Sequence, residues 1–77
     1  MLIPSKYENV SQNILSIGAD IIKTLRGRKN IYALYKKVIE LRNDEYKISF
    51  DRYLLALDTL YALGKIDIEG QDIVRLS

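Results

Sequence analysis

Few residues of this 77-residue chain have the types and spacing that catalysis requires. The sequence contains no histidine and no cysteine, which excludes disulfides, thiolate or imidazole metal ligands, and the two commonest nucleophile and base side chains. Gly64 and Lys65 are similar to the end of a phosphate-binding loop. That motif needs glycine where Thr59 stands and serine or threonine where Ile66 stands. The sequence therefore holds no phosphate-binding loop.

Carboxylates form two groups along the chain. Asp44 and Glu45 are adjacent in a polar break, and Asp67, Glu69 and Asp72 cluster around a predicted hairpin. Neither group has a recognisable base, a nucleophile or the full set of calcium-ligand positions beside it. We interpret both groups as solvated turns, and we expect a non-enzymatic protein with no cofactor and no metal.

Composition indicates one small globular domain. With 48% hydrophobic and 29% charged residues, a chain of this length buries about 60% of the surface that its unfolded form exposes. A net charge of +2 is weak for a dedicated nucleic-acid binder. No apolar run approaches the roughly 20 residues of a membrane span, and the first residues do not form a signal peptide. We therefore expect a cytoplasmic protein without a membrane partner.

The stretch 49–76 organises the predicted fold. Ser49 is a suitable N-cap, and Gly64 follows the last residue of a helical apolar pattern, where positive φ is usual. The inward residues of this helix are Phe50, Tyr53, Leu54, Leu57, Leu60 and Tyr61. The pattern then alternates, which predicts a hairpin over 65–76 with Ile66, Ile68, Ile73, Val74 and Leu76 as its apolar residues.

Two further helices precede this stretch, over 11–26 and 30–43, the second with Asn30 as N-cap. The inward stripe of the second helix includes Leu41. The apolar stripe of the first helix consists of Ile14, Ile17, Gly18, Ile21, Ile22 and Leu25. The place of Gly18 in this stripe indicates a close helix contact. The order predicts a mainly α domain with a small β-hairpin, a winged helix-turn-helix of three helices plus a C-terminal wing. We assign 11–77 to this domain and 1–10 to an extended N-terminal arm.

Two surfaces are candidates for binding a partner. One is the arm, whose apolar residues either cover the domain's own core or insert into a partner. The other is the face of the third helix opposite the core, where an apolar strip is flanked by carboxylates. The candidate residues are Leu2, Ile3, Pro4 and Lys6 in the arm, and Asp51, Leu55, Asp58 and Ala62 on the helix.

Nucleic acid is the alternative partner. Arg26, Arg28 and Lys29 are either a solvated helix end or contacts to a phosphate backbone, which position nucleic acid without reading its sequence. On the third helix only Arg52 suits a base edge, and the two carboxylates would confront the phosphates across the groove. The residues thus favour a protein-binding module, and they leave open a DNA-binding winged-helix transcriptional regulator and a homodimer.

Both ends of the chain resemble a known family. The first stretch is IPSKYENVSQNILSIGADIIKTL, with the motifs Pro4-Ser5-Lys6 and Ser16-Ile17-Gly18-Ala19. The second stretch is SFDRYLLALDTLYALGKIDIEG, with the motifs Ala56-Leu57-Asp58 and Leu63-Gly64-Lys65-Ile66. They are similar to a small middle component that accompanies ABC ATPases in bacterial three-component conflict systems, which are thought to act against phages. The resemblance implies an adaptor subunit between an SMC/Rad50-like ABC ATPase and an effector protein, with the catalytic chemistry in those other subunits.

Overall fold

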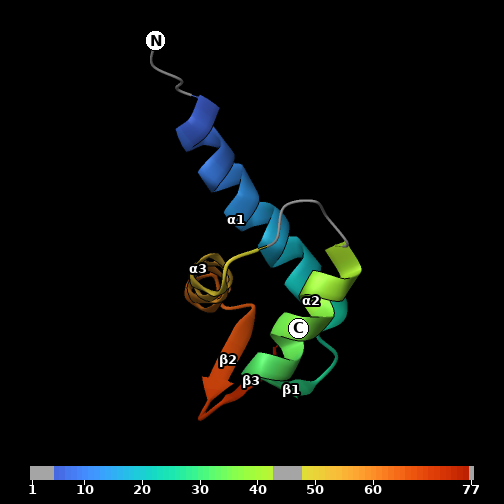
Figure 1. Cartoon of the computed structure of the whole chain (residues 1–77). Coiled ribbons are helices and arrows are strands. Elements are labelled where there is room, and N and C mark those ends of the chain that lie inside the picture. The colour runs from blue at the N-terminus through green and yellow to red at the C-terminus, as the bar shows by residue number, and fades with distance from the viewer. Residues whose placement is uncertain (1–4, 43–47, 77) are drawn as a thin grey trace.

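The computed structural model describes residues 5–42 and 48–76, with side chains from Asn13 onward. Its elements follow one another as helix, strand, two helices and two strands (Figure 1). They are α1 (Ser5–Thr24), β1 (Arg28–Asn30), α2 (Ile31–Arg42), α3 (Phe50–Ala62), β2 (Ile66–Glu69) and β3 (Asp72–Arg75). This order confirms the predicted class, a mainly α winged helix-turn-helix with a C-terminal hairpin.

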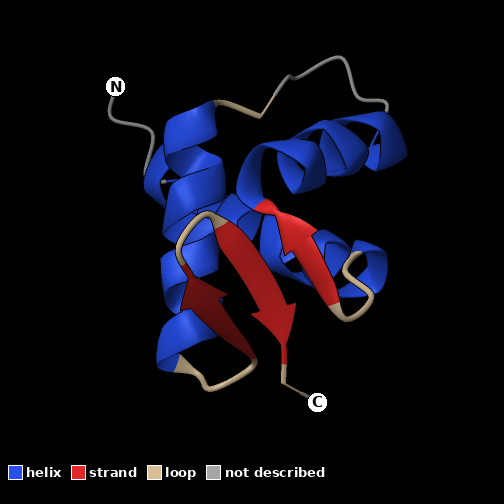
Figure 2. Cartoon of the chain, turned by 90° about the horizontal axis from the view of Figure 1, so that it is seen from below, coloured by secondary structure: helices blue, strands red, loops and turns tan. Residues whose placement is uncertain are grey.

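The strands form one antiparallel sheet in the order β1-β3-β2 (Figure 2). Ile73, in the central strand β3, pairs with Lys29 of β1 on one side and Ile68 of β2 on the other. The sequence analysis predicted only the hairpin and assigned no strand to residues 28–30, so strand β1 was missed. A strand of three residues is too short to show alternation. Strand β1 forms by pairing with β3, which is distant in sequence, and beside this pair Arg75 N donates to Gly27 O at 2.7 Å.

Helix α1 starts earlier than predicted. It begins at Ser5, so residues 5–10, which the sequence analysis assigned to an extended arm, are helical and that assignment is wrong. Proline restricts the residue before it and is well tolerated at a helix start, so Pro4 does not prevent a helix that begins directly after it. The N-terminal part of α1 projects beyond the other elements (Figure 1). The division of the chain into an arm and a domain stays a prediction.

The predicted caps of the other helices are present. Asn30 Oδ1 accepts from the backbone N–H groups of Tyr32 at 2.9 Å and Ala33 at 3.3 Å, ahead of α2. Ser49 Oγ accepts from Arg52 N at 3.1 Å, ahead of α3. These bonds satisfy amides that have no partner inside the helix, so both starts are encoded locally.

All three helices and the sheet contribute to one core. Its buried residues are Ile17, Ile21, Leu25, Leu34, Val38, Ile48, Tyr53, Ala56, Leu57, Leu60, Ile66 and Ile73. Four residues predicted to face inward are instead exposed, namely Leu41, Tyr61, Ile68 and Leu76. They lie near the ends of their elements, where the helical or alternating period continues but the described residues leave the side chain exposed.

Aromatic side chains hold α2 against α3. Tyr35 and Tyr53 have ring centroids 4.9 Å apart, and Phe50 lies against both rings. The hydroxyl of Tyr53 donates to Ile31 O at 2.7 Å, and that of Tyr35 donates to Ile48 O at 2.6 Å. These bonds orient α3 relative to α2, and so decide which face of α3 remains at the surface.

Candidate functional site

The outer face of α3 consists of Asp51, Leu55, Asp58 and Ala62, and all four are exposed. They follow one another at intervals of four, three and four residues, which places them on one side of a helix. Leu55 is 51% exposed, whereas Tyr53 on the opposite side is fully buried. The outer face is thus an apolar strip between two carboxylates.

Helix α3 occupies the recognition-helix position of a winged helix-turn-helix. In DNA readers such a helix presents hydrogen-bond donors to base edges in the major groove. Here the outer face carries Asp51 and Asp58, which repel phosphates, and Leu55, which donates no hydrogen bond. Arg52 is half-buried at the flank. The charge and chemistry of this face favour a protein surface over a DNA base reader.

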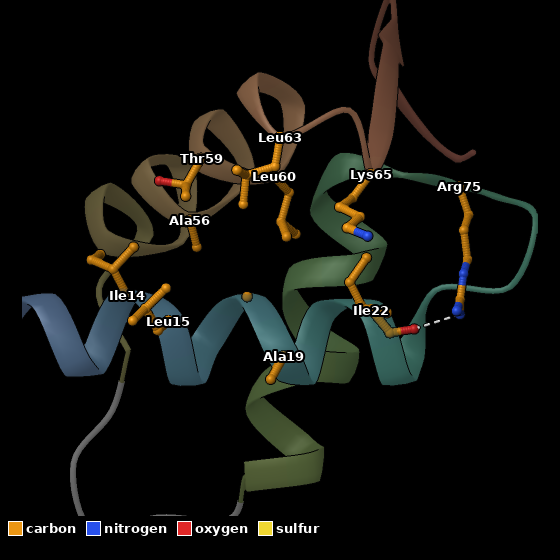
Figure 3. A pocket seen from close by; sticks show the side chains of 11 residues that line it. Ile14, Leu15, Ala19, Ile22, Ala56, Thr59, Leu60, Leu63, Lys65 and Arg75 are labelled. Atoms are coloured by element: carbon orange, nitrogen blue, oxygen red, sulfur yellow. Dashed lines mark hydrogen bonds between the residues drawn. The ribbon is translucent and has the colours of Figure 1, made fainter. Parts of the chain in front are cut away.

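A second apolar surface runs between α1 and α3 (Figure 3). We call it the α1–α3 groove; its volume is about 430 Å³. It is lined by Ile14, Leu15, Gly18, Ala19 and Ile22 of α1, by Ala56, Thr59, Leu60 and Leu63 at α3, and by Lys65 and Arg75. Leu15 is 65% exposed and Leu63 is 63% exposed, so the groove has a leucine on each rim.

Gly18 lies where the two helices approach each other across the groove. A Cβ at this position would be 3.6 Å from Leu60 Cδ2, an ordinary van der Waals distance. Gly18 is buried against α3, which confirms the predicted helix contact. A larger side chain here would have to enter the groove or displace Leu60.

Lys65 is placed at one end of the groove by the way α3 terminates. Gly64 has φ of 75°, and its N–H donates to Tyr61 O at 3.0 Å. The next N–H, that of Lys65, donates to Leu60 O at 2.9 Å, which completes a Schellman motif. The chain therefore turns back over the last helical turn, and the Lys65 side chain points toward α1 (Figure 3).

Arg75 brings a second positive charge to the same end. Its Nη1 donates to the carbonyl of Ile22 in the last turn of α1, at 2.7 Å, and to that of Leu25 just after the helix, at 3.2 Å. Cations suit that end of a helix because of its dipole. The residues that line the groove include these two cations and no carboxylate.

The structure does not bring Arg26, Arg28 and Lys29 together into one basic patch. Arg28 forms ion pairs with Glu69 and, at 3.3 Å, with Asp72, so its charge is compensated. Lys29 follows Arg28 in strand β1, where successive side chains alternate between the two faces of the sheet, and is half-buried.

Arg26 instead borders a shallow hollow with Lys23 and Lys37. Glu40 lies at the same hollow, which reduces its net positive charge. The grouping joins the end of α1 to α2, so it depends on tertiary structure and was not predicted. Its three basic side chains are of the type that contacts a phosphate backbone.

The arm candidates are not placed. Leu2, Ile3 and Pro4 lie outside the described residues, and Lys6 lies in α1 with a side chain that is not described. Their role in binding a partner stays a prediction.

The described part of the chain shows no group of three acidic side chains positioned to hold a metal ion. Burial raises the pKa of Tyr53, but its hydroxyl bonds a helix carbonyl and has a structural role. None of the described helices combines the length and apolarity that crossing a membrane requires.

The sequence analysis missed most of the α1–α3 groove. Leu15 and Ala19 were left out of the apolar stripe of the first helix, although their spacing of four residues beside Gly18 and Ile22 was a signal. The placement of Lys65 could not be read from spacing, because it depends on the helix end and on the packing of α1 against α3.

The fold and surfaces described above define a small winged-helix domain without a visible catalytic centre in its described residues. Residues 3–77 match the family of ABC-three component (ABC-3C) system Middle Component 6, and the chain belongs to that family. No curated protein and no solved structure matches the chain. Membership in a three-component ABC system implies an ATPase and another component as partners.

Proposed function

We propose that this middle component is a non-enzymatic adaptor that links an SMC/Rad50-like ABC ATPase to an effector in an antiphage complex. The observation that carries the proposal is the outer face of α3. A winged helix that presents Asp51, Leu55 and Asp58 where a DNA reader presents donors is suited to protein binding. Membership in a three-component family supplies two protein partners to be linked.

Leu55 provides the main gain from an interface at the outer face. Full burial of an exposed leucine contributes about 1.5–3 kcal/mol, and Leu55 starts 51% exposed, so its further burial contributes about 1 kcal/mol. Asp51 and Asp58 then lie at the rim, where a basic partner can pair with them. Rim charges of this kind contribute more to association rate and specificity than to affinity.

The second candidate function is DNA binding by a transcriptional regulator. The hollow at Lys23, Arg26 and Lys37 supports some contact with a phosphate backbone. Binding through such residues alone is insensitive to sequence and weakens strongly with salt. Backbone contact is compatible with an adaptor, whereas a regulator also needs base readout from α3.

Co-purification of the chain with the ATPase and the other component of its system tests the adaptor role. Leu55→Glu places a charge on the outer face and is expected to reduce assembly while leaving the fold intact. Leu41→Glu is the matched control, because Leu41 is 52% exposed on α2. Circular dichroism confirms the folding of both variants.

Deleting residues 1–4 tests the arm separately, since α1 begins at Ser5. If a folded Leu55→Glu variant assembles normally and the deletion variant does not assemble, the partner-binding site lies on the arm. Tight, sequence-selective duplex binding at physiological salt would favour the regulator. If the unaltered chain binds neither component, the adaptor role is wrong.

A further inference from the structure

We propose that the α1–α3 groove is a second docking surface, which receives an apolar helix carrying a carboxylate near one end. The occupant belongs to a different component of the system from the one that binds the outer face of α3. This inference rests on the proposed adaptor function, which requires two partners, and it assigns one surface to each of them.

The shape of the groove suits a helix. Two helices, α1 and α3, form its walls, and Leu15 and Leu63 stand exposed on opposite rims. Between them the floor includes Gly18 and Ala56, which are buried where α1 meets α3 and carry no long side chain into the groove. A third helix laid between two others buries both rims at once, and helix packing of this kind places axes about 8–10 Å apart.

Charge identifies the occupant further. Within the described residues Lys65 forms no ion pair, and the Schellman motif at Gly64 fixes its backbone at the end of the groove. A segment that covers the groove removes water from this ammonium group, which is costly unless an opposite charge replaces the water. Arg75 adds positive charge at the same end. We therefore expect the occupant to bring an aspartate, a glutamate or a terminal carboxylate to that end.

The two surfaces on α3 have opposite charge. The outer face carries Asp51 and Asp58, whereas the groove carries Lys65 and Arg75. A single helical segment complementary to one surface would place like charges against the other, which disfavours binding there. Leu55 and Leu63 are eight residues apart, which is about 80° around a helix, so the surfaces are neighbours facing different directions.

Site-specific crosslinking tests the assignment, since the native chain has no cysteine and each introduced thiol is unique. Leu63→Cys, Leu55→Cys and the control Leu41→Cys each receive a photoreactive maleimide and are mixed with the ATPase and the other component. Mass spectrometry then identifies the crosslinked peptides. We expect Leu63→Cys to capture an apolar segment containing an acidic residue from one component, and Leu55→Cys to capture the other component. Leu41→Cys should capture neither efficiently.

Affinity measurements with each purified component give the second test. Leu63→Glu is expected to weaken binding of the groove's partner about 10-fold or more, since it removes burial of an exposed leucine. Lys65→Glu should weaken the same partner several-fold, with an effect that shrinks as salt rises. Leu55→Glu should weaken only the other component. All three substituted positions are exposed, and thermal melts confirm that the variants fold.

Specific results would overturn the proposal. If Leu63→Glu and Lys65→Glu bind both components normally while Leu55→Glu fails to assemble, the groove is not a docking surface and the adaptor role stands. If Leu63→Glu abolishes self-association of the chain alone in sedimentation, the occupant is a second copy. If groove variants and outer-face variants lose binding to the same component, the two surfaces form one continuous binding site. If the unaltered chain binds no component, both proposals fail.

Discussion

Gly18 offers a direct test of how closely α1 and α3 pack. In a helix interior, alanine is favoured over glycine by about 1 kcal/mol. The added Cβ would lie 3.6 Å and 3.7 Å from Leu60 Cδ2 and Cγ, distances at which dispersion is attractive and no clash occurs. We therefore expect Gly18→Ala to raise the free energy of unfolding by about 0.5–1 kcal/mol. For a domain of this size that raises Tm by roughly 2–8 °C.

Gly18→Leu should have the opposite effect. Its side chain extends past the space that a Cβ fills and must displace Leu60 or leave its preferred rotamer, at a cost of about 1–3 kcal/mol. Urea and thermal unfolding followed by circular dichroism measure both variants. Ala33→Leu is the control, because Ala33 is exposed on α2 and its replacement should change stability by less than about 0.5 kcal/mol. A destabilised Gly18→Ala variant, or a Gly18→Leu variant that melts like the unaltered chain, would refute this account.

Four further substitutions test other contacts. Gly64→Ala should destabilise by about 1–2 kcal/mol in urea unfolding, because its φ is 75° although no heavy atom lies within 4 Å of the new Cβ; no change would mean that the helix end adapts. Tyr53→Phe should cost about 0.5–1.5 kcal/mol, because the hydrogen bond from its hydroxyl to Ile31 O is lost. Burial raises the pKa of Tyr53, so the folded state keeps the proton while the unfolded state ionises near pH 10; stability should fall above about pH 10, and less steeply in the phenylalanine variant. Arg28→Ala should cost less than about 1 kcal/mol and leave duplex affinity unchanged in fluorescence anisotropy, whereas Arg26→Ala should reduce it; equal losses would restore Arg28 as a phosphate contact.

Local signals in the sequence were sufficient for the fold class. The N-caps Asn30 and Ser49 and the glycine after α3 act through neighbouring backbone groups, so residue type and spacing predict them. Long-range features were not predictable in the same way. Strand β1 forms only because β3 lies beside it, and three residues carry no periodic signal of their own.

The candidate surfaces also differ in whether they depend on local or long-range structure. The exposure of the outer face of α3 follows from one helical period, and the predicted positions of Leu55 and Asp58 at the surface are confirmed. The α1–α3 groove needs residues from two helices and from the start of the wing, so it appears only once the packing is known. The pairing of Arg28 with Glu69 is likewise a tertiary contact, and it compensates the charge of a basic residue that the sequence offers to nucleic acid.

The position of a helix in a fold does not determine what the helix binds. Helix α3 stands where DNA-reading winged helices contact bases, yet binding there depends on donors and positive charge at the outer surface. In this chain, Asp51 and Asp58 occupy that surface, and the positive charge of Lys65 lies beyond the C-terminal end of the helix, beside an apolar groove. Reversing both carboxylates to lysine would therefore give the outer face the charge of a DNA binder without altering its core contacts. If such a variant gains salt-sensitive duplex binding and loses its protein partner, surface charge on a common scaffold is what separates the two functions.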